Sequence, residues 1–68
     1  MTTYYEIYVL NSAGAIIKRF NAGTDAYAAS EAMRHIAAAC PVIYPLTNKL
    51  HLIGRCDGEV VHSRYREV

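Results

Sequence analysis

The segment KLHLIGRCDGEVVHSRYR, residues 49–66, holds many of the side chains that could do chemistry. Two histidines, one cysteine and four of the seven Lys/Arg residues alternate there with apolar residues around a central Asp-Gly. Imidazole and thiolate groups can hold a metal ion or form a nucleophile with its base, whereas clustered cations bind carboxylates and phosphates. The spacing of these residues decides which of these kinds of chemistry the chain supports.

A metal site and a nucleophilic site both lack residues that they need. His51 and His62 are a candidate pair of metal ligands, but no third ligand accompanies them and their cationic neighbours oppose a divalent ion. Cys56 is expected on the opposite face of the hairpin from both histidines, so its thiol has no imidazole base. The sequence therefore predicts no catalytic residues, no metal, no cofactor and a protein that is not an enzyme.

Length and composition indicate a single domain, residues 1–68, near the lower limit for a stable hydrophobic core. Alanine supplies much of the 53% hydrophobic share, so the six tyrosines and one phenylalanine fill much of the core. Tyrosine needs a partner for its hydroxyl and lies at core margins, which favours a homodimer without requiring one. The net charge of +1 excludes an acidic nucleic-acid mimic and gives no whole-chain argument for non-specific DNA binding.

No segment has the features of a signal peptide or a membrane span. MTTYYEIYVL lacks a basic start and a long apolar run, and no stretch approaches the ~20 apolar residues of a spanning helix. Cys40 and Cys56 are too few and too far apart for a disulfide framework or a zinc site. We expect a cytoplasmic protein with reduced thiols and no membrane partner.

Period-two alternation predicts two β-hairpins, one at each end of the chain. Asn-Ser-Ala-Gly connects the first pair of strands and Asp57-Gly58 the second, and both turns contain residues that tolerate positive φ. The predicted strands are residues 4–10, 15–22, 49–56 and 59–65. Lys18 and Arg19 are adjacent, so one must face each side of its strand.

A helix is predicted over residues 26–39, capped by Thr24 or Asp25 and ended by Pro41. Its apolar stripe repeats at three and four residues and consists of Ala29, Ala32, Met33, Ile36, Ala37 and Cys40. The connection PVIYPLTN, residues 41–48, is expected to pack over the open end of the core rather than form an exposed interaction surface. The predicted fold is α+β: a ββαββ two-layer sandwich with one helix on a four-stranded antiparallel sheet.

The Asp57-Gly58 turn sets the register expected for the last hairpin. The pairs predicted on one face are Lys49–Arg66, His51–Arg64, Ile53–His62 and Arg55–Val60. That face holds four of the seven Lys/Arg residues, two of the three histidines and no carboxylate. The other face, centred on Leu50, Leu52 and Val61, is expected to meet the helix.

Cations directly opposite each other are mildly destabilising, so an acid-free cationic face favours an anionic partner. The simpler alternative is the solvated outer face of a two-layer sandwich. The predicted partner-binding residues are Lys49, His51, Ile53, Arg55, His62, Arg64 and Arg66. The first predicted partner is a protein, and the alternative is RNA or single-stranded DNA, with Tyr4 and Tyr8 stacking on bases.

One resemblance rests on FNAGTDAYAASEAMRHIAAA, residues 20–39, together with the hairpin before it. A strand that runs through Ala-Gly-Thr-Asp into an alanine- and methionine-containing helix resembles the layout of small phage anti-CRISPR proteins that inhibit type I surveillance complexes. The resemblance covers residues 5–40. It implies a compact, non-enzymatic protein that acts in the host cytoplasm, binds a Cas subunit or complex, and blocks DNA recognition or cleavage. The near-neutral charge differs from the acidic members that imitate DNA.

Overall fold

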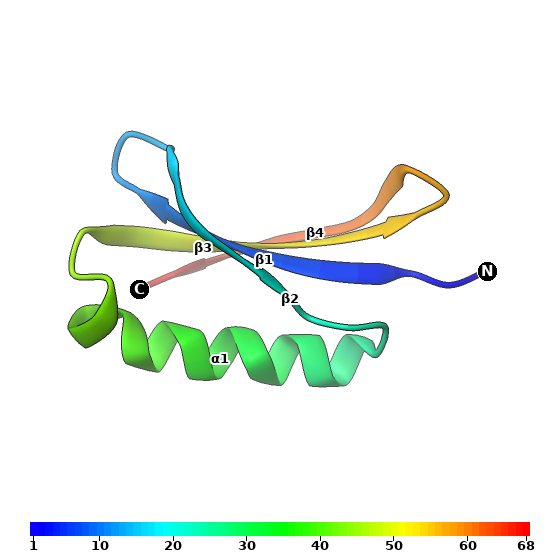
Figure 1. The fold of residues 1–68 in the computed structure, drawn as a ribbon, viewed down its shortest axis with the longest axis horizontal. Helices are drawn as coiled ribbons and strands as arrows, with labels where there is room; N and C mark the ends of the chain where they lie inside the picture. The colour runs from blue at the N-terminus through cyan, green and yellow to red at the C-terminus, as the bar shows by residue number, and fades with distance from the viewer.

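The computed structural model describes all 68 residues, and two hairpins flank one helix as predicted (Figure 1). The elements are β1 (Tyr4–Asn11), β2 (Ile16–Asn21), α1 (Ala26–Ile43), β3 (Thr47–Cys56) and β4 (Glu59–Glu67). The strands form one antiparallel sheet in the order β2-β1-β3-β4, so β2 and β4 are its edges. The helix α1 covers one face, called the helix face, and leaves the other, the open face, uncovered. The α+β two-layer prediction is confirmed.

Turn residues fix both hairpins locally. Asp57 and Gly58 have φ values of 53° and 81°, the two positive angles that a tight two-residue turn requires. In the first hairpin, the Asn11 side chain accepts hydrogen bonds from the backbone N–H groups of Ala13 and Ala15, both at 2.9 Å. Each turn is therefore specified by residues within the hairpin that it closes.

The helix begins as predicted and ends later than predicted. The Asp25 carboxylate accepts a hydrogen bond from the Ala28 N–H at 2.8 Å, so Asp25 is the N-cap. The prediction that Pro41 ends the helix is wrong, because α1 continues to Ile43 with Pro41 inside its last turn. So close to the end, proline removes one backbone hydrogen bond without disrupting a helix beyond it.

The core lies between α1 and the two central strands, and the predicted helix stripe is confirmed. The buried cluster consists of Ile7, Val9, Ala29, Met33, Cys40, Leu50 and Leu52. Neither edge strand contributes a buried residue, and only Phe20 of β2 packs against the cluster. Both edges of the sheet therefore leave most of their side chains exposed.

The predicted register of the last hairpin is correct only beside the turn. Arg55 pairs with Val60 as predicted, but Gly54 pairs with His62, so Val61 is the extra residue of a β-bulge. Every later residue of β4 consequently faces the side opposite to the predicted one. Val61, which was expected in the core, is 56% exposed.

Candidate functional site

The predicted binding residues divide between the two faces of the sheet. Lys49, His51, Ile53 and Arg55 lie on the open face, whereas His62, Arg64 and Arg66 pair with helix-face residues of β3. Acidic residues also lie on the open face, because Glu67 pairs with Lys49 and Glu6 of β1 pairs with Ile53. The prediction that the last hairpin has one acid-free cationic face is therefore wrong, because the bulge at Val61 brings Glu67 onto the open face and moves His62, Arg64 and Arg66 off it.

Glu6 compensates the cations at the centre of the open face. Its carboxylate accepts hydrogen bonds from the Arg55 guanidinium and, at 3.0 Å, from the Tyr8 hydroxyl. The Nε of Arg19 lies 3.8 Å from the same carboxylate. Arg55 Nη1 also donates a hydrogen bond to the Tyr8 hydroxyl at 3.3 Å, and this bond, followed by the attraction of Glu6, raises the pKa of Arg55. This part of the surface is a connected polar network and not a free cationic patch.

Three rings form a row across the open face from β1 to β4. His51 lies opposite both Tyr8 and Tyr65 in the sheet. The His51 and Tyr65 rings stack with centroids 4.0 Å apart and planes 14° from parallel, and Lys49 Nζ lies 5.3 Å from the Tyr65 centroid. Burial is the main cause that lowers the pKa of His51. Burial therefore favours the neutral form of the imidazole in this stack.

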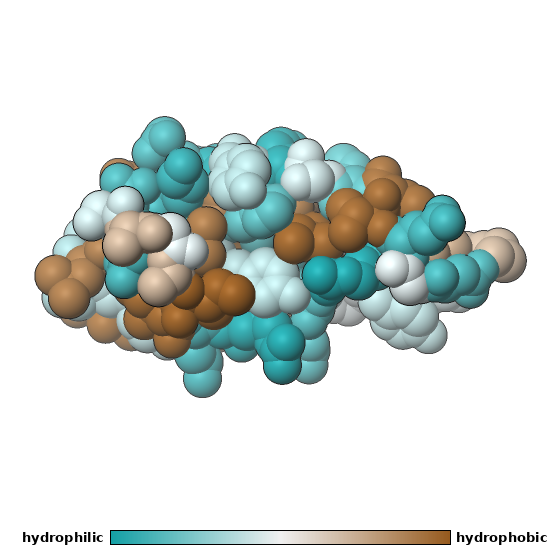
Figure 2. All heavy atoms as spheres, turned by 90° about the horizontal axis from the view of Figure 1, so that it is seen from above, coloured by the Kyte–Doolittle hydropathy of each residue, from teal (hydrophilic) through white to brown (hydrophobic).

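Beside this row the open face is hollowed by about 410 Å³. Rings, cations and aliphatic side chains line it together: Tyr8, His51, Tyr65, Arg19, Arg55, Leu10, Ile16 and Ile53. Figure 2 looks onto this side of the molecule and shows apolar side chains in separate groups, with polar side chains between them. This mixture suits a ligand that is planar and carries negative charge.

The three basic or imidazole side chains on the helix side of β4 have different surroundings. Arg64 Nη2 donates a hydrogen bond to Ser30 Oγ at 3.1 Å and so joins β4 to α1. The His62 ring meets the Tyr5 ring edge-on with centroids 6.0 Å apart. Arg66 forms no ion pair. Arg64 and Arg66 therefore place positive charge on the helix side of β4, away from the open face.

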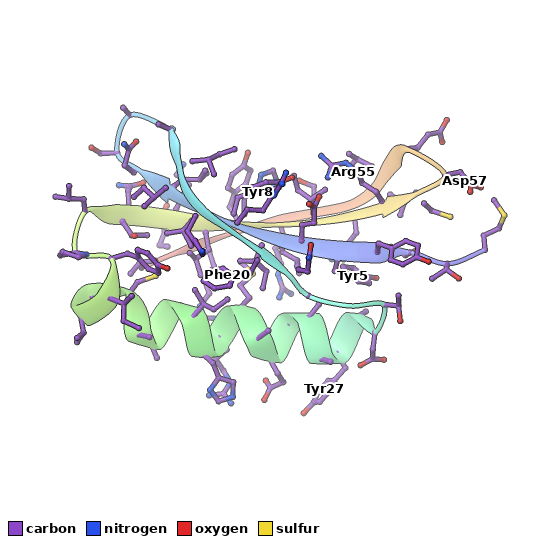
Figure 3. The ribbon with its side chains drawn as sticks, viewed as in Figure 1. Tyr5, Tyr8, Phe20, Tyr27, Arg55 and Asp57 are labelled. Carbon is purple, nitrogen blue, oxygen red and sulfur yellow. The ribbon has the colours of Figure 1, made fainter.

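Sequence reasoning missed an apolar groove between β2 and α1. One hollow of about 300 Å³ is lined by Phe20, His35, Ile36, Ala39, Ile43 and Tyr44. A second, of about 240 Å³, is lined by Asn11, Ile17, Ile43, Tyr44, Pro45 and Leu46. The two hollows share Ile43 and Tyr44, and we call them together the β2–α1 groove. Figure 3 shows Phe20 reaching from β2 into the space above α1.

Large apolar side chains at the end of this groove are exposed. Val42 is 85% exposed, Leu46 79% and Ile43 61%. The prediction that residues 41–48 pack over the core is wrong for these three, because the helix continues past Pro41 and carries Val42 and Ile43 outward. Only Tyr44 of this segment packs against the core. The two prolines among consecutive apolar residues were the available signal, since they mark a rigid apolar segment.

The structure contains no group of three or more His, Cys, Asp or Glu side chains that could hold a metal ion, and both cysteines are free. No helix has the length and apolar character needed to cross a membrane. No protein-family model, curated protein or solved structure matches the chain. The surfaces of the molecule are therefore the basis on which its function is proposed.

Proposed function

We propose that the chain is a non-catalytic protein-binding domain and that the β2–α1 groove is its binding surface. The observation that carries the proposal is the contiguous set of exposed apolar side chains at the groove, from Ile17 to Ile43 and Leu46. Soluble monomers rarely expose large contiguous apolar patches, and such patches mark interaction sites. The class of function is the one expected from the sequence, but the surface differs from the predicted β3–β4 face.

Local rigidity supports binding at this groove. Pro41 and Pro45 restrict the backbone on either side of the exposed side chains, and Tyr44 between them packs against the core. A surface that is already ordered loses little conformational entropy when a partner binds. Apolar area and preorganisation together favour a protein partner here.

A pair of matched variants tests the proposed surface. Ile43→Asp places a charge in the groove, and Val61→Asp places the same charge on the β4 side; the two residues are 61% and 56% exposed. After nuclease treatment, wild type and Val61→Asp should capture the same protein from the source cells, and Ile43→Asp should not. Equal capture by both variants would contradict the proposal.

The resemblance to type I anti-CRISPR proteins names the first partner to test within this proposal. A Cas subunit or surveillance complex in the host cytoplasm should co-elute with the chain in size-exclusion chromatography, and its binding to target DNA should fall. Ile43→Asp should restore DNA binding. DNA binding and DNA cleavage that are both unaffected by excess wild-type protein would reject the anti-CRISPR assignment and leave the protein-binding proposal standing.

A second candidate function is binding of single-stranded RNA on the open face, favoured by the stacked His51 and Tyr65 rings beside the 410 Å³ hollow. Exposed rings stack on bases, and Arg19 and Lys49 lie near enough to meet phosphates. Titration with a single-stranded RNA at about 50 mM and 200 mM salt should show strongly salt-dependent binding that Tyr65→Ala weakens. Absence of binding at the lower salt excludes this candidate.

A further inference from the structure

We infer that the segment bound by the β2–α1 groove is an extended acidic peptide that pairs with the free edge of β2 as a fifth strand. This inference rests on the proposed function and specifies the form and charge of the partner. Three observations lead to it: the free backbone edge of β2, the apolar groove beneath that edge, and the charge of β2.

The outer edge of β2 offers unpaired backbone groups, because β1 is its only neighbour in the sheet. The Ala22 N–H donates to the Tyr5 carbonyl of β1 at 2.8 Å. Backbone groups alternate in direction along a strand, so the N–H groups of Asn21 and Arg19 point away from β1. An added strand can pair with these groups, as in other cases of strand addition.

The bulge in β2 limits where such pairing is regular. Val9 pairs with Lys18 and Leu10 pairs with Ile16, so Ile17 is the extra residue. The regular part of the edge is residues 18–21, which is long enough for a short peptide. Ile17 itself lines the second hollow of the groove, where a bound peptide would continue.

The groove lies where alternate side chains of an added strand would point. Lys18 and Phe20 pair with Val9 and Ile7, whose side chains are buried on the helix face. Residues of an added strand beside Lys18 and Phe20 would project to the same side, toward the 300 Å³ hollow between Phe20 and α1 (Figure 3). Apolar residues at every second position of the peptide fit this arrangement.

The charge of β2 selects an acidic occupant. The strand IIKRFN contains two cations and no carboxylate. Arg19 lies near Glu6 on the open face, but Lys18 forms no ion pair and its Nζ lies 5.8 Å from the Phe20 ring centroid at the groove. His35 lines the same hollow. A carboxylate of the peptide would therefore meet an uncompensated ammonium group.

The same charges disfavour a second copy of this chain as the occupant. Antiparallel pairing of β2 with itself, centred on Lys18 or on Arg19, would bring that cation against the same cation of the other copy. Like charges opposite each other destabilise a strand pair, and basic residues on an edge strand prevent self-association. A negatively charged partner is attracted by the positive charge of Lys18 and Arg19, whereas a second copy is repelled by it.

Selection from a displayed library of random nine-residue peptides on the immobilised full chain tests the inference. Enriched peptides should combine alternating apolar residues with Asp or Glu. The peptides are then titrated against wild type and three variants, all at exposed positions of β2: Asn21→Pro, Asn21→Ala and Lys18→Glu. Proline removes an outward N–H of the edge and no hydrogen bond to β1, and alanine is its control.

Asn21→Pro should weaken binding about five-fold and Lys18→Glu about ten-fold, while Asn21→Ala leaves it unchanged. The bound peptide should also slow hydrogen exchange of the Arg19 and Asn21 amides. Peptides that bind all variants equally, enrichment of basic peptides, no enrichment, or a wild-type dimer abolished by Asn21→Pro would each overturn the inference. If Ile43→Asp abolishes partner capture while Asn21→Pro and Lys18→Glu retain it, the proposed function stands and the strand addition fails.

Discussion

The two edges of the sheet are both exposed, yet they leave different surfaces beside the helix. At the β4 edge, Arg64 bonds to Ser30 of α1 at 3.1 Å, and His62 and Arg66 lie along the same side. At the β2 edge, no hydrogen bond connects the strand to α1, and the space between them is the apolar groove. One edge therefore has a polar contact with the helix, and the other has an apolar groove beside it.

This difference shows that the charge of an edge strand does not determine the shape of the surface beside it. Both edges carry basic residues and a bulge, which are common protections against uncontrolled strand pairing. Only the β2 edge combines these with an open apolar groove. At β2, Lys18 lies beside this groove, and this arrangement is the basis for proposing an acidic strand as the partner.

The largest effect on the free energy of unfolding should come from a substitution in the hydrophobic core, on which both edge strands depend. Leu52 is 1% exposed and pairs with Ile7 on one side and Arg64 on the other. Leu52→Ala should lower the free energy of unfolding by about 3 kcal/mol in urea denaturation, a large part of the total for a domain of this size. Leu46→Ala, in the exposed groove, should change it by less than about 0.5 kcal/mol. Equal losses would contradict the assignment of the core.

The next effect should come from Gly54, where β3 lies close to side chains of both β1 and β4. A Cβ added at Gly54 would lie 2.8 Å from Cε1 of Tyr5 and 3.1 Å from Cβ of His62. Gly54→Val should therefore cost about 2 kcal/mol and speed amide exchange in β4 more than in β2. Val60→Ile adds bulk at an exposed β4 position and serves as the control. Faster exchange at both edges alike would remove the distinction between them.

A smaller change should make the β4 edge resemble the β2 edge. Arg64→Ala removes the hydrogen bond to Ser30 but changes the unfolding free energy by no more than about 0.5 kcal/mol, because the bond lies at the exposed surface. Hydrogen exchange of β4 amides should nevertheless increase. Arg66→Ala, which removes a cation without a bond to α1, should leave exchange unchanged. Identical exchange in the two variants would show that Arg64 does not close this edge.

The smallest effect is the pH dependence of the ring row that reaches β4. Burial and then the charge of Arg55 lower the pKa of His51 below its ordinary value of 6.5. The unfolded chain therefore takes up this proton first, so His51 makes the fold less stable as the pH falls from 6.5 toward the folded pKa. NMR titration of the imidazole should show this, and Arg55→Gln should move the midpoint back toward 6.5. A midpoint above 6.5 in wild type would contradict it.

Most of the fold could be predicted because it is determined locally. Asp57-Gly58 specifies its turn through two positive φ angles, and Asp25 specifies the helix start through one capping bond. The adjacent Lys18 and Arg19 do face opposite sides, toward Val9 and Tyr8 respectively in the sheet. The helix end was less predictable, because Pro41 disfavours a helical continuation that tertiary context still permits.

The surfaces were much less predictable, because they depend on single-residue shifts. Val60 and Val61 are the same residue type, so nothing in the sequence shows that one of them lies outside the regular ladder. This shift places Arg64 and Arg66 on the opposite face of the sheet from His51, so the predicted binding residues are divided between the two faces. The groove was missed because the apolar residues after Pro41 fit a core-covering loop as well as an exposed surface.

The bulge at Val61 also has a consequence for how relatives of this chain would be aligned. All pairs from Gly54–His62 onward would persist if Val61 were deleted, since Val61 has no partner in the ladder. Deleting Ser63 instead would invert the remaining residues of the strand. A homologue one residue shorter in this hairpin should therefore carry its gap at Val61, within the strand, and not at the Asp57-Gly58 turn where alignments usually place one.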